Sequence, residues 1–308
     1  MIDVTRITDE GTVPDGRPFI RVEGCGNFSV LKTFDCGQCF RFDPVVGSDI
    51  NVHEVSGVAL GRQIKIRQES DSNGSIVITG ADAHDWHTVW KRYLSLDTDY
   101  TEIDRQITSA LDPDGCRVMK RAVQLSRGIR ILRQDPWETL CSFIISQNNN
   151  IPRIKKIIFA MCEKLGDVTQ DGYGKTFPSP ETVAAAGEDE ILSLRCGFRA
   201  PYIVDAARRV ASGDVDLGAI AACENYSECD EQLRRIRGVG PKVSACTLLF
   251  GFGRLEAYPI DTWIRKVESR HFPAGLDHER FGKYAGIAQQ YLFYMERYID
   301  AKDSREIS

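Results

Sequence analysis

Apolar and polar residues alternate along the first part of the chain and follow a helical spacing along the rest. Up to about residue 80, apolar and polar residues alternate within short runs such as R-Q-I-K-I-R-Q at 62–68 and S-I-V-I-T at 75–79, and turn residues separate these runs. A period of two is typical of strands with one buried face. From Asp85 onward, apolar residues recur at helical spacing. The pattern therefore predicts an α+β protein, with helices near 86–96, 117–126, 136–147, 151–165, 181–194, 200–212, 229–237, 241–252, 261–271 and 279–299.

Two of the predicted helices carry more information than the others. After Pro241 the segment V-S-A-C-T-L-L-F is almost entirely apolar, which indicates a buried helix. Along the last helix a core stripe recurs at steps of four and three: Phe281, Ala285, Ala288, Leu292, Met295 and Ile299. Gln289 and Phe293 lie one position off this stripe and one turn apart, so they can face a pocket at the margin of the core. Core packing is the alternative for Phe293.

Length and composition are those of an ordinary globular protein. The 308 residues, 42% hydrophobic and 27% charged, suffice for two or three subdomains. No apolar run approaches the roughly 20 residues that span a bilayer, and the start M-I-D-V-T-R-I-T-D-E has no hydrophobic signal core. We expect a cytoplasmic protein, or a nuclear one in a eukaryote, without a membrane partner.

The net charge of −5 argues against a nucleic-acid-binding protein only if the charge is spread evenly. Basic residues instead gather in groups: Arg117, Lys120, Arg121, Arg127, Arg130 and Arg133; Arg153, Lys155 and Lys156; Arg195 and Arg199; Arg234, Arg235 and Arg237. We infer one basic groove on an acidic body. A solvated mixture of charges is the alternative.

A glycine-containing turn precedes the buried helix, in the sequence I-R-G-V-G-P-K from Ile236 to Lys242. Gly238 and Gly240 allow positive φ and close backbone approach, and Pro241 suits a first helical turn. Backbone N–H groups of such a turn can bind a phosphate. Lys242 lies in the first turn, where the helix dipole disfavours an ammonium, so it can act as a nucleophile. A solvated lysine that only touches phosphate is the alternative.

Asp261, in Y-P-I-D before T-W-I-R-K-V, has the sequence context of a helix N-cap. A carboxylate held in this way can also stabilise positive charge that builds on a neighbouring sugar ring. It would at the same time favour the protonated form of Lys242, in opposition to the helix dipole. The sequence does not decide which of the two effects on the protonation of Lys242 is larger.

Four motifs together resemble one protein family. They are G-Q-C-F-R-F from Gly37, R-Q-D-P-W-E-T-L-C-S-F-I-I-S-Q-N-N-N-I-P-R from Arg133, C-G-F-R-A-P-Y from Cys196 and A-Q-Q-Y-L-F ending at Phe293. With the lysine hairpin and the distant aspartate they resemble the 8-oxoguanine DNA glycosylase family of the helix-hairpin-helix superfamily. The resemblance implies an N-terminal antiparallel β domain at 1–115 and an all-α helix-hairpin-helix domain at 116–308.

The resemblance implies a bifunctional glycosylase and lyase acting in base excision repair. Lys242 would attack C1′ of the damaged nucleotide while Asp261 stabilises the cationic sugar, and β-elimination from the Schiff base would nick the strand. A flipped base is expected between Phe293 and Cys246, with Gln289 on its Watson–Crick edge and the Gly37 carbonyl accepting the N7 hydrogen of 8-oxoguanine. The substrate-binding group is expected to include also Phe250 and Pro259.

The resemblance also implies how the two strands are held. Asn148 would fill the gap left by the flipped base, Phe198 would wedge beside it, and Arg153 and Arg199 would read an opposite cytosine. The remaining expected DNA contacts are Asn149, Gly238, Gly240 and Trp263. The family often has histidine where this chain has Trp263, so the contact to the flanking phosphate departs from the family pattern.

No metal or cofactor is expected to be required. The ten cysteines, without a secretory signal, indicate free thiols, and none follows Cys246, which excludes the iron-sulfur branch of the superfamily. Cys36 and Cys39 form a lone C-x-x-C with no second pair to complete a zinc site. The resemblance leaves room for a structural cation at the hairpin carbonyls of Arg234, Ile236 and Val239.

Duplex DNA containing 8-oxoguanine is the expected partner of a monomer.

Two other functions compete. A glycosylase for alkylated bases shares the hairpin and the aspartate but lacks the lysine, so Lys242 speaks against it. A non-catalytic helix-hairpin-helix module would only contact phosphates.

Overall fold

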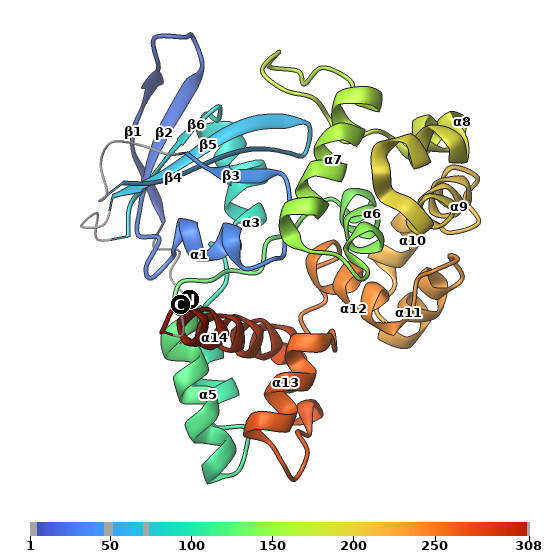
Figure 1. Ribbon diagram of the computed structural model, residues 1–308. Coiled ribbons are helices and arrows are strands. Elements are labelled where there is room, and N and C mark those ends of the chain that lie inside the picture. Colours follow the sequence, from blue (N-terminus) through green and yellow to red (C-terminus); the bar gives the residue numbers. More distant parts are fainter. Residues whose placement is uncertain (1–4, 46–51, 70–73, 307–308) are drawn as a thin grey trace.

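An antiparallel sheet forms the N-terminal part of the protein, as predicted. The computed structural model describes residues 5–45, 52–69 and 74–306, and the sheet has the order β1-β2-β6-β5-β4-β3 (Figure 1). The strands are β1 (Arg6–Thr12), β2 (Pro18–Glu23), β3 (Phe42–Pro44), β4 (Val52–Ala59), β5 (Arg62–Glu69) and β6 (Ile76–Thr79). Every neighbouring pair is antiparallel.

The alternation read from the sequence sets which face of the sheet is buried. Ile20, Ile78, Ile66 and Val55 are paired across four neighbouring strands and are all buried. Because paired residues point to the same face, they form one apolar row. The short helix α1 (Val30–Asp35) and the indoles that follow the sheet belong to the same hydrophobic cluster.

Helices make up the rest of the described chain. They are α2 (Ala83–Asp85), η1 (Trp86–Trp90), α3 (Lys91–Tyr93), α4 (Tyr100–Thr108), α5 (Pro113–Ser126), α6 (Pro136–Ser146), α7 (Ile151–Leu165), α8 (Pro180–Ile191), η2 (Leu192–Cys196), η3 (Gly197–Arg199), α9 (Ala200–Ala211), α10 (Leu217–Ala222), α11 (Tyr226–Arg234), α12 (Pro241–Phe250), α13 (Thr262–His271), η4 (His278–Tyr284) and α14 (Ala285–Glu306). The α+β prediction is therefore confirmed.

Three helices and two starting points differ from the prediction. Helices α1, α4 and α10 were not predicted, because α1 and α10 have only six residues each and α4 buries only three side chains. Helix α11 begins at Tyr226 rather than 229, since Asn225 caps it, and α5 begins at Pro113 rather than 117, since Asp112 caps it. The predicted helix 279–299 is interrupted at Gly282, where φ is 54°.

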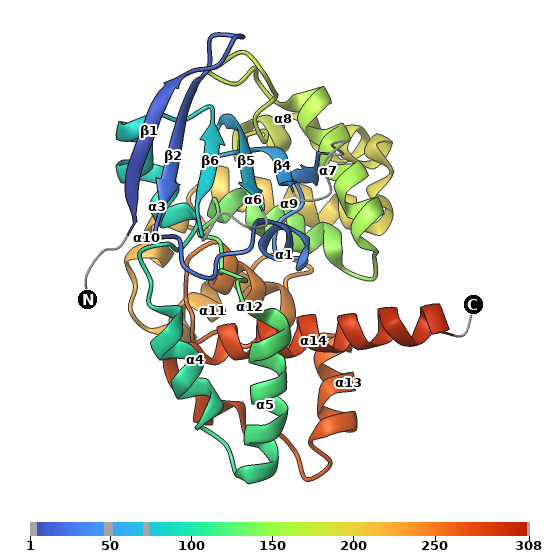
Figure 2. The same ribbon diagram turned by 90° about the vertical axis from the view of Figure 1, so that its left-hand side faces the viewer.

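The helical core surrounds α12 and α14. Every residue of α12 from Val243 to Phe250 is buried, as predicted for its apolar segment. Helix α14 crosses α5 and packs on α13 (Figure 2). Its predicted stripe is buried, except that Ile299 is only partly buried.

The two hydrophobic clusters do not divide at residue 115. Leu132 belongs to the cluster of the sheet, and Cys36 and Phe40 belong to the cluster of the helices. The division into 1–115 and 116–308 stays a prediction. The partly buried ion pair of Arg41 with Glu138 (3.2 Å) joins the sheet part to α6 across this region.

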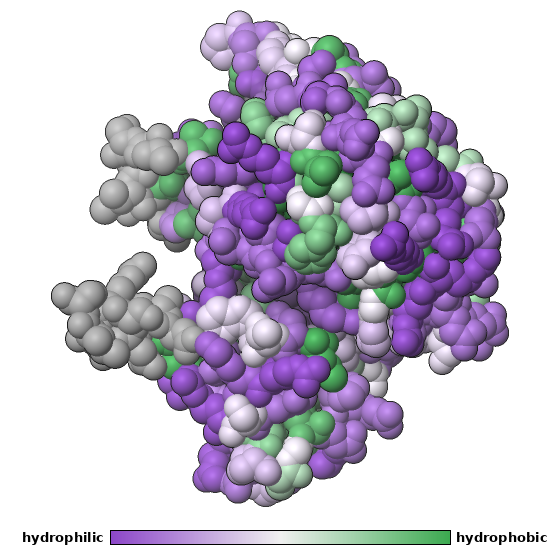
Figure 3. Space-filling model, turned by 45° about the vertical axis from the view of Figure 1, so that its right-hand side comes forward, coloured by the Kyte–Doolittle hydropathy of each residue, from purple (hydrophilic) through white to green (hydrophobic). Residues whose placement is uncertain are grey.

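Most of the face in Figure 3 is hydrophilic, with hydrophobic residues in separate groups. No helix among the described residues is long and apolar enough to cross a membrane.

Candidate active site

A cavity of about 760 Å³ opens where the sheet part meets the helical core. Its walls come from the turn after α1, the end of α6 with the asparagine run, α12, the start of α13 and α14. Eleven of the sixteen predicted site residues line it: Gly37, Asn148, Asn149, Lys242, Cys246, Phe250, Pro259, Asp261, Trp263, Gln289 and Phe293. The cavity therefore brings together the predicted nucleophile, carboxylate and base-binding residues.

The amine of Lys242 is held by the end of α6. Its Nζ donates to Ser146 Oγ at 3.1 Å and lies 4.9 Å from the ring centroid of Phe143. The Ser146 hydroxyl itself donates to the Phe143 carbonyl at 2.8 Å. Because this hydroxyl proton is already engaged, Ser146 acts as an acceptor toward the lysine. The sequence prediction missed Ser146, although it lies two residues before the asparagine run.

If the predicted base excision takes place, replacing Ser146 with alanine is expected to slow it by about tenfold in a single turnover, because Lys242 loses the hydrogen bond that orients its amine. The rate is measured with excess protein on a lesion-containing duplex. Ser142→Ala, one turn earlier on α6, is the matched control and should keep the parent rate. Equal losses in both variants would contradict the positioning role.

Asp261 caps α13, as predicted. Its Oδ1 accepts hydrogen bonds from the backbone N–H groups of Trp263 (3.0 Å) and Ile264 (2.9 Å). Burial raises the pKa of this carboxyl, while the two N–H groups and the charge of Lys242 act in the opposite direction. The carboxylate is thus rigid and partly desolvated, the condition in which it interacts most strongly with a nearby cation.

Cys246 lies one turn after Lys242 and faces the same cavity. Burial raises the pKa of its thiol to about 11; the charge of Asp261 adds to this effect and Lys242 opposes it. The residue is therefore a neutral, polarisable wall of the cavity and not a second nucleophile.

Aromatic side chains line the part of the cavity that suits a planar ring, and one polar side chain lies at its end. Phe250 stacks on Phe143 at 5.4 Å, and the ring of Phe293 meets Trp263 edge to face at 6.3 Å. The Gln289 side chain is buried, and its Oε1 has no hydrogen-bond partner among the described residues. A buried amide oxygen without a donor is costly, so this position favours a ligand that supplies one.

The remaining predicted DNA contacts lie outside the cavity. Arg153 is exposed, and its Nη2 donates to the Arg195 carbonyl at 3.2 Å. Phe198 is 54% exposed, with the guanidinium of Arg199 over its ring at 4.3 Å. An exposed aromatic side chain supported from beneath by a cation suits a wedge against a base stack.

Arg199, which is predicted to read the opposite cytosine, is almost fully buried, and its contact with a cytosine stays a prediction. It is 2% exposed and donates to the carbonyls of Cys196, Gln147 and Asn148. Asn148 beside it has a φ of 47°. In this structure Arg199 fixes the shape of the asparagine run.

The hairpin uses its two glycines differently. Gly238 has a φ of 81°, whereas Gly240 has a φ of −94° and caps α12, so only the first needs the left-handed conformation. A Cβ at Gly238 would lie 2.4 Å from the Tyr202 ring, whereas one at Gly240 would meet nothing within 4 Å. Gly238 therefore serves the packing of the hairpin against α9.

Replacing Gly238 with alanine is expected to lower the free energy of unfolding by about 2 kcal/mol or more, since both the positive φ and the Tyr202 ring oppose a Cβ. Urea denaturation measures the change. The matched variant Gly240→Ala should cost less than about 1 kcal/mol. Similar losses at the two glycines would contradict this account of the hairpin.

The predicted basic groove is weaker than the count of basic residues suggests. Arg130 and Arg199 are buried. Acidic neighbours neutralise four others in ion pairs: Arg117 with Asp114, Arg133 with Asp97, Arg234 with Asp230 and Arg235 with Asp214. Two of these pairs lie within one helix. The clustering of basic residues in the sequence could not predict the other two, because Asp97 and Asp214 come from distant segments.

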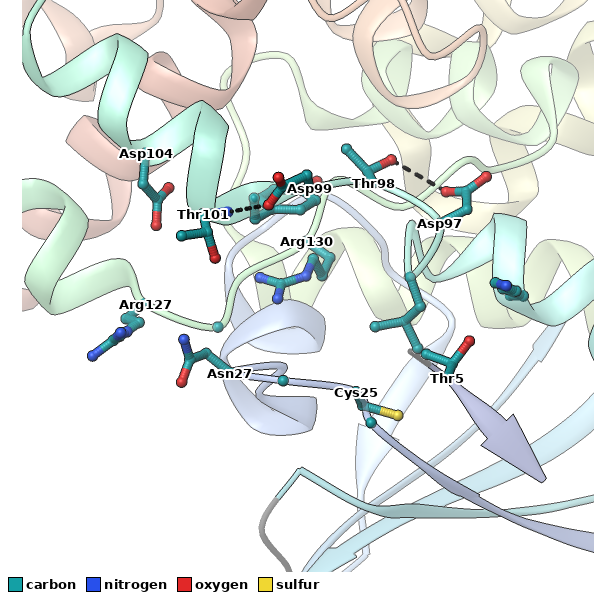
Figure 4. A pocket seen from close by; sticks show the side chains of 16 residues that line it. Thr5, Cys25, Asn27, Asp97, Thr98, Asp99, Thr101, Asp104, Arg127 and Arg130 are labelled. Atoms are coloured by element: carbon teal, nitrogen blue, oxygen red, sulfur yellow. Dashed lines mark hydrogen bonds between the residues drawn. The ribbon is translucent and has the colours of Figure 1, made fainter. Parts of the chain in front are cut away.

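A second cavity, of about 390 Å³, lies between the sheet part and α4 (Figure 4). Three of its charged groups already have intramolecular roles. Asp99 caps α4 by accepting from Thr101 N at 3.0 Å, and the Arg130 guanidinium covers the Tyr100 ring at 4.2 Å. Asp97 pairs with Arg133 at 3.0 Å. These contacts explain the cavity as a polar junction between the two parts of the fold.

Within the described chain, no cluster of three or more histidine, cysteine or acidic residues could hold a metal ion. Cys36 and Cys39 are buried free thiols, and burial raises the pKa of Cys36 to about 12. At the hairpin, the Ile236 carbonyl already accepts from the Val239 N–H at 3.1 Å. The cation expected at the carbonyls of Arg234, Ile236 and Val239 stays a prediction.

Comparisons with known proteins cover both parts of the chain. Residues 23–140 match the model of the 8-oxoguanine DNA glycosylase N-terminal domain, and residues 141–280 match that of the HhH-GPD superfamily base excision DNA repair protein. The solved structure of MBOgg1 in complex with a low-affinity DNA ligand is 36% identical, with a TM-score of 0.84 over 96% of this chain and 99% of that chain.

Two further relatives are consistent with these family matches. The Clostridium acetobutylicum 8-oxoguanine glycosylase/lyase, solved with double-stranded DNA containing cytosine opposite 8-oxoguanine, is 33% identical, with a TM-score of 0.84 over 97% of this chain and 100% of that chain. The Saccharomyces cerevisiae N-glycosylase/DNA lyase is 32% identical over 215 residues, which are 55% of this chain. The match spans 57% of the yeast protein's length, less than two thirds of it.

Proposed function

Because the chain belongs to the 8-oxoguanine DNA glycosylase family of the helix-hairpin-helix superfamily, we propose that it excises 8-oxoguanine from duplex DNA and nicks the strand by β-elimination. The observation that carries this proposal is one cavity lined by Lys242, Asp261 and Cys246 together with an aromatic wall and the unsatisfied amide of Gln289. The reaction belongs to base excision repair.

Lys242 is the nucleophile of the proposed reaction. Its neutral amine attacks C1′ of the flipped nucleotide, the glycosidic bond breaks, and the electron pair of that bond leaves with the base. Asp261 stabilises the positive charge that develops on the sugar. Loss of a proton from the attacking nitrogen and opening of the ring give a Schiff base. Removal of a C2′ proton then expels the 3′ phosphate, which leaves the strand cut.

The lesion is recognised by hydrogen bonds that guanine cannot complete. In the proposed complex the base lies between Phe293 and Cys246, with Gln289 on its Watson–Crick edge. The Gly37 carbonyl accepts the N7 hydrogen that 8-oxoguanine has and guanine lacks. Guanine would place its N7 acceptor against that carbonyl, so no hydrogen bond would form between them. Both acceptors would still lose their contact with water, and nothing would offset that cost.

The test is borohydride trapping on duplexes with 8-oxoguanine opposite cytosine. A covalent protein–DNA adduct that forms with the parent and is absent with Lys242→Gln supports the proposal. A glycosylase for alkylated bases would release base without an adduct. A non-catalytic module would bind DNA and give neither product.

Cytosine opposite the lesion is the preferred pairing in this proposal. We expect Arg153→Ala to narrow the ratio of excision rates opposite cytosine and opposite adenine by about tenfold, because one good contact to a base edge discriminates by about 1–3 kcal/mol. Lys156→Ala, on the same helix, is the matched control and should weaken binding to both duplexes alike. An unchanged ratio in Arg153→Ala would contradict the assignment.

The partner in this proposal is duplex DNA containing 8-oxoguanine, bound by a monomer that needs no cofactor. The protein would work in the cytoplasm, or in the nucleus of a eukaryote. Asn149, Gly238, Gly240 and Trp263 complete the proposed DNA contacts, and Phe250 and Pro259 complete the base pocket.

A further inference from the structure

Glutamine side chains hold the turn around Gly37 from both sides. Nε2 of Gln290, on α14, donates to the Cys36 carbonyl at 2.9 Å. Nε2 of Gln134 donates to the Gln38 carbonyl at 2.8 Å. No described residue donates to the carbonyl of Gly37 itself, which lies between these two. The pattern leaves one acceptor of the turn available at the cavity wall.

A third glutamine anchors the same turn. Gln38 is 1% exposed, and its Nε2 donates to the carbonyls of Thr33 (2.9 Å) and Arg130 (2.8 Å). Its Oε1 accepts from Leu132 N at 2.9 Å. The backbone on the C-terminal side of Gly37 is thereby fixed to the segment that also carries Gln134.

Gly37 needs such support because of its own conformation. Its φ is 80°, a region that glycine enters freely, and glycine also has the widest choice of alternatives. Each peptide unit is planar, so the direction of a carbonyl is the direction of its plane. With the carbonyls of Cys36 and Gln38 fixed, the plane that contains the Gly37 carbonyl has little freedom to rotate.

The two outer glutamines also connect Gly37 to the base-stacking residues. Gln290 follows Gln289 directly and lies within one turn of Phe293 on α14. A Cβ at Gly37 would lie 3.7 Å from the Phe293 ring, so a side chain at this position would occupy the space beside that ring. The backbone N–H of Gln134 donates to the Phe250 carbonyl, at the end of α12, at 2.9 Å. Both donors therefore belong to the part of the fold that carries the reacting lysine.

We propose that Gln134 and Gln290, the glutamine clamp, are positioning residues for base selection. They hold the Gly37 carbonyl oxygen in the orientation in which it accepts the N7 hydrogen of 8-oxoguanine. In the same orientation it would face the N7 of guanine, which is also an acceptor. This inference rests on the proposed function and adds to it the residues that set its selectivity. The amide nitrogens of both glutamines donate to backbone carbonyls of the Gly37 turn and not to Lys242 or Asp261, so strand cleavage at a ready-made abasic site is expected not to depend on the clamp.

The test compares two reactions of each variant. Gln134→Met and Gln290→Met keep side-chain length and remove the amide donor, and they are measured singly and together. Single-turnover excision of 8-oxoguanine opposite cytosine is set against nicking of a preformed abasic site. We expect excision to fall about tenfold for each single variant and nicking to stay within about twofold of the parent. In a Lys242→Gln background, the ratio of affinities for 8-oxoguanine and guanine duplexes should fall by a similar factor.

Gln68→Met is the matched control. Gln68, on β5, also donates from Nε2 to a loop carbonyl, that of Phe28 at 2.7 Å, and its Oε1 accepts from Val30 N at 3.1 Å, so its contacts lie at the start of α1 and not at the carbonyls beside Gly37. Its variant should keep the parental ratio of excision to nicking. The inference is overturned if excision and nicking fall together in the clamp variants, if neither changes, or if Gln68→Met shifts the ratio equally. Failure of the proposed function is seen separately, as a parent protein that does not excise 8-oxoguanine at all.

Discussion

The Lys242→Gln variant is expected to form no borohydride-trapped adduct and to excise 8-oxoguanine at least about a thousandfold more slowly than the parent. The amine that Ser146 and Phe143 contact at the cavity is then replaced by an amide that cannot attack carbon. Single-turnover excision, nicking and trapping on one labelled duplex measure the three losses together.

The same variant should still bind the lesion. Glutamine keeps most of the side-chain volume, and the cavity walls at Cys246, Gln289 and Phe293, which are proposed to bind the base, are unchanged. A matched control is Lys164→Gln, because Lys164 pairs with Glu190 on the outside of the protein. The nucleophile assignment is wrong if Lys242→Gln nicks at the parental rate, or if both lysine variants lose activity equally.

Asp261→Asn is expected to slow excision by about 10²–10³-fold while the protein stays folded. Asparagine supplies the same capping oxygen for the N–H groups of Trp263 and Ile264, so α13 keeps its first turn. What is lost is the negative charge beside the developing positive charge on the sugar. Excision rate and thermal unfolding of the same preparation separate the two effects.

Another aspartate provides the control for capping alone. Asp216 caps α10 with hydrogen bonds of 2.8 and 3.0 Å to Gly218 N and Ala219 N. Asp216→Asn should leave excision unchanged. An Asp261→Asn protein with parental excision would mean that the carboxylate serves only as a helix cap.

The raised pKa of Asp261 gives a pH dependence with a definite sign. Burial raises the pKa above the ordinary aspartate value of 3.8, so the folded protein takes up a proton more readily than the unfolded chain. The stability linked to this group is therefore complete below the unfolded pKa and is lost as pH rises through the folded pKa. Charged Asp261 thus costs stability at neutral pH, and Asp261→Asn should unfold at the same temperature as the parent or higher. On acidification, the rate of excision should decline as Asp261 becomes protonated, and this should occur at a higher pH than for an aspartate with the ordinary pKa.

Residue patterns predicted the architecture and the chemical centre because both depend on local features. The alternation in β5 and β6 specifies one buried face, and the apolar segment after Pro241 specifies a buried helix. Lys242 and Asp261 could be recognised from a hairpin and a cap, which are short-range signals. Their meeting in one cavity followed from family resemblance and not from spacing.

Other parts of the site depend on contacts between distant segments. Ser146 meets Lys242, and Gln290 meets Cys36, across separations that no periodicity encodes. Helix α4 carries too few apolar residues to stand out, and the six-residue helices α1 and α10 are shorter than the window that reveals a helical period. Pairing of basic residues such as Arg235 with Asp214 likewise becomes visible only in three dimensions.

The burial of Arg199 has a thermodynamic consequence for DNA association. A guanidinium has five N–H donors, and four hydrogen bonds to neighbouring carbonyls already occupy it. The asparagine run is thereby ordered before any ligand arrives, and association loses little conformational entropy there. We therefore expect this segment of the backbone to change little when a duplex binds.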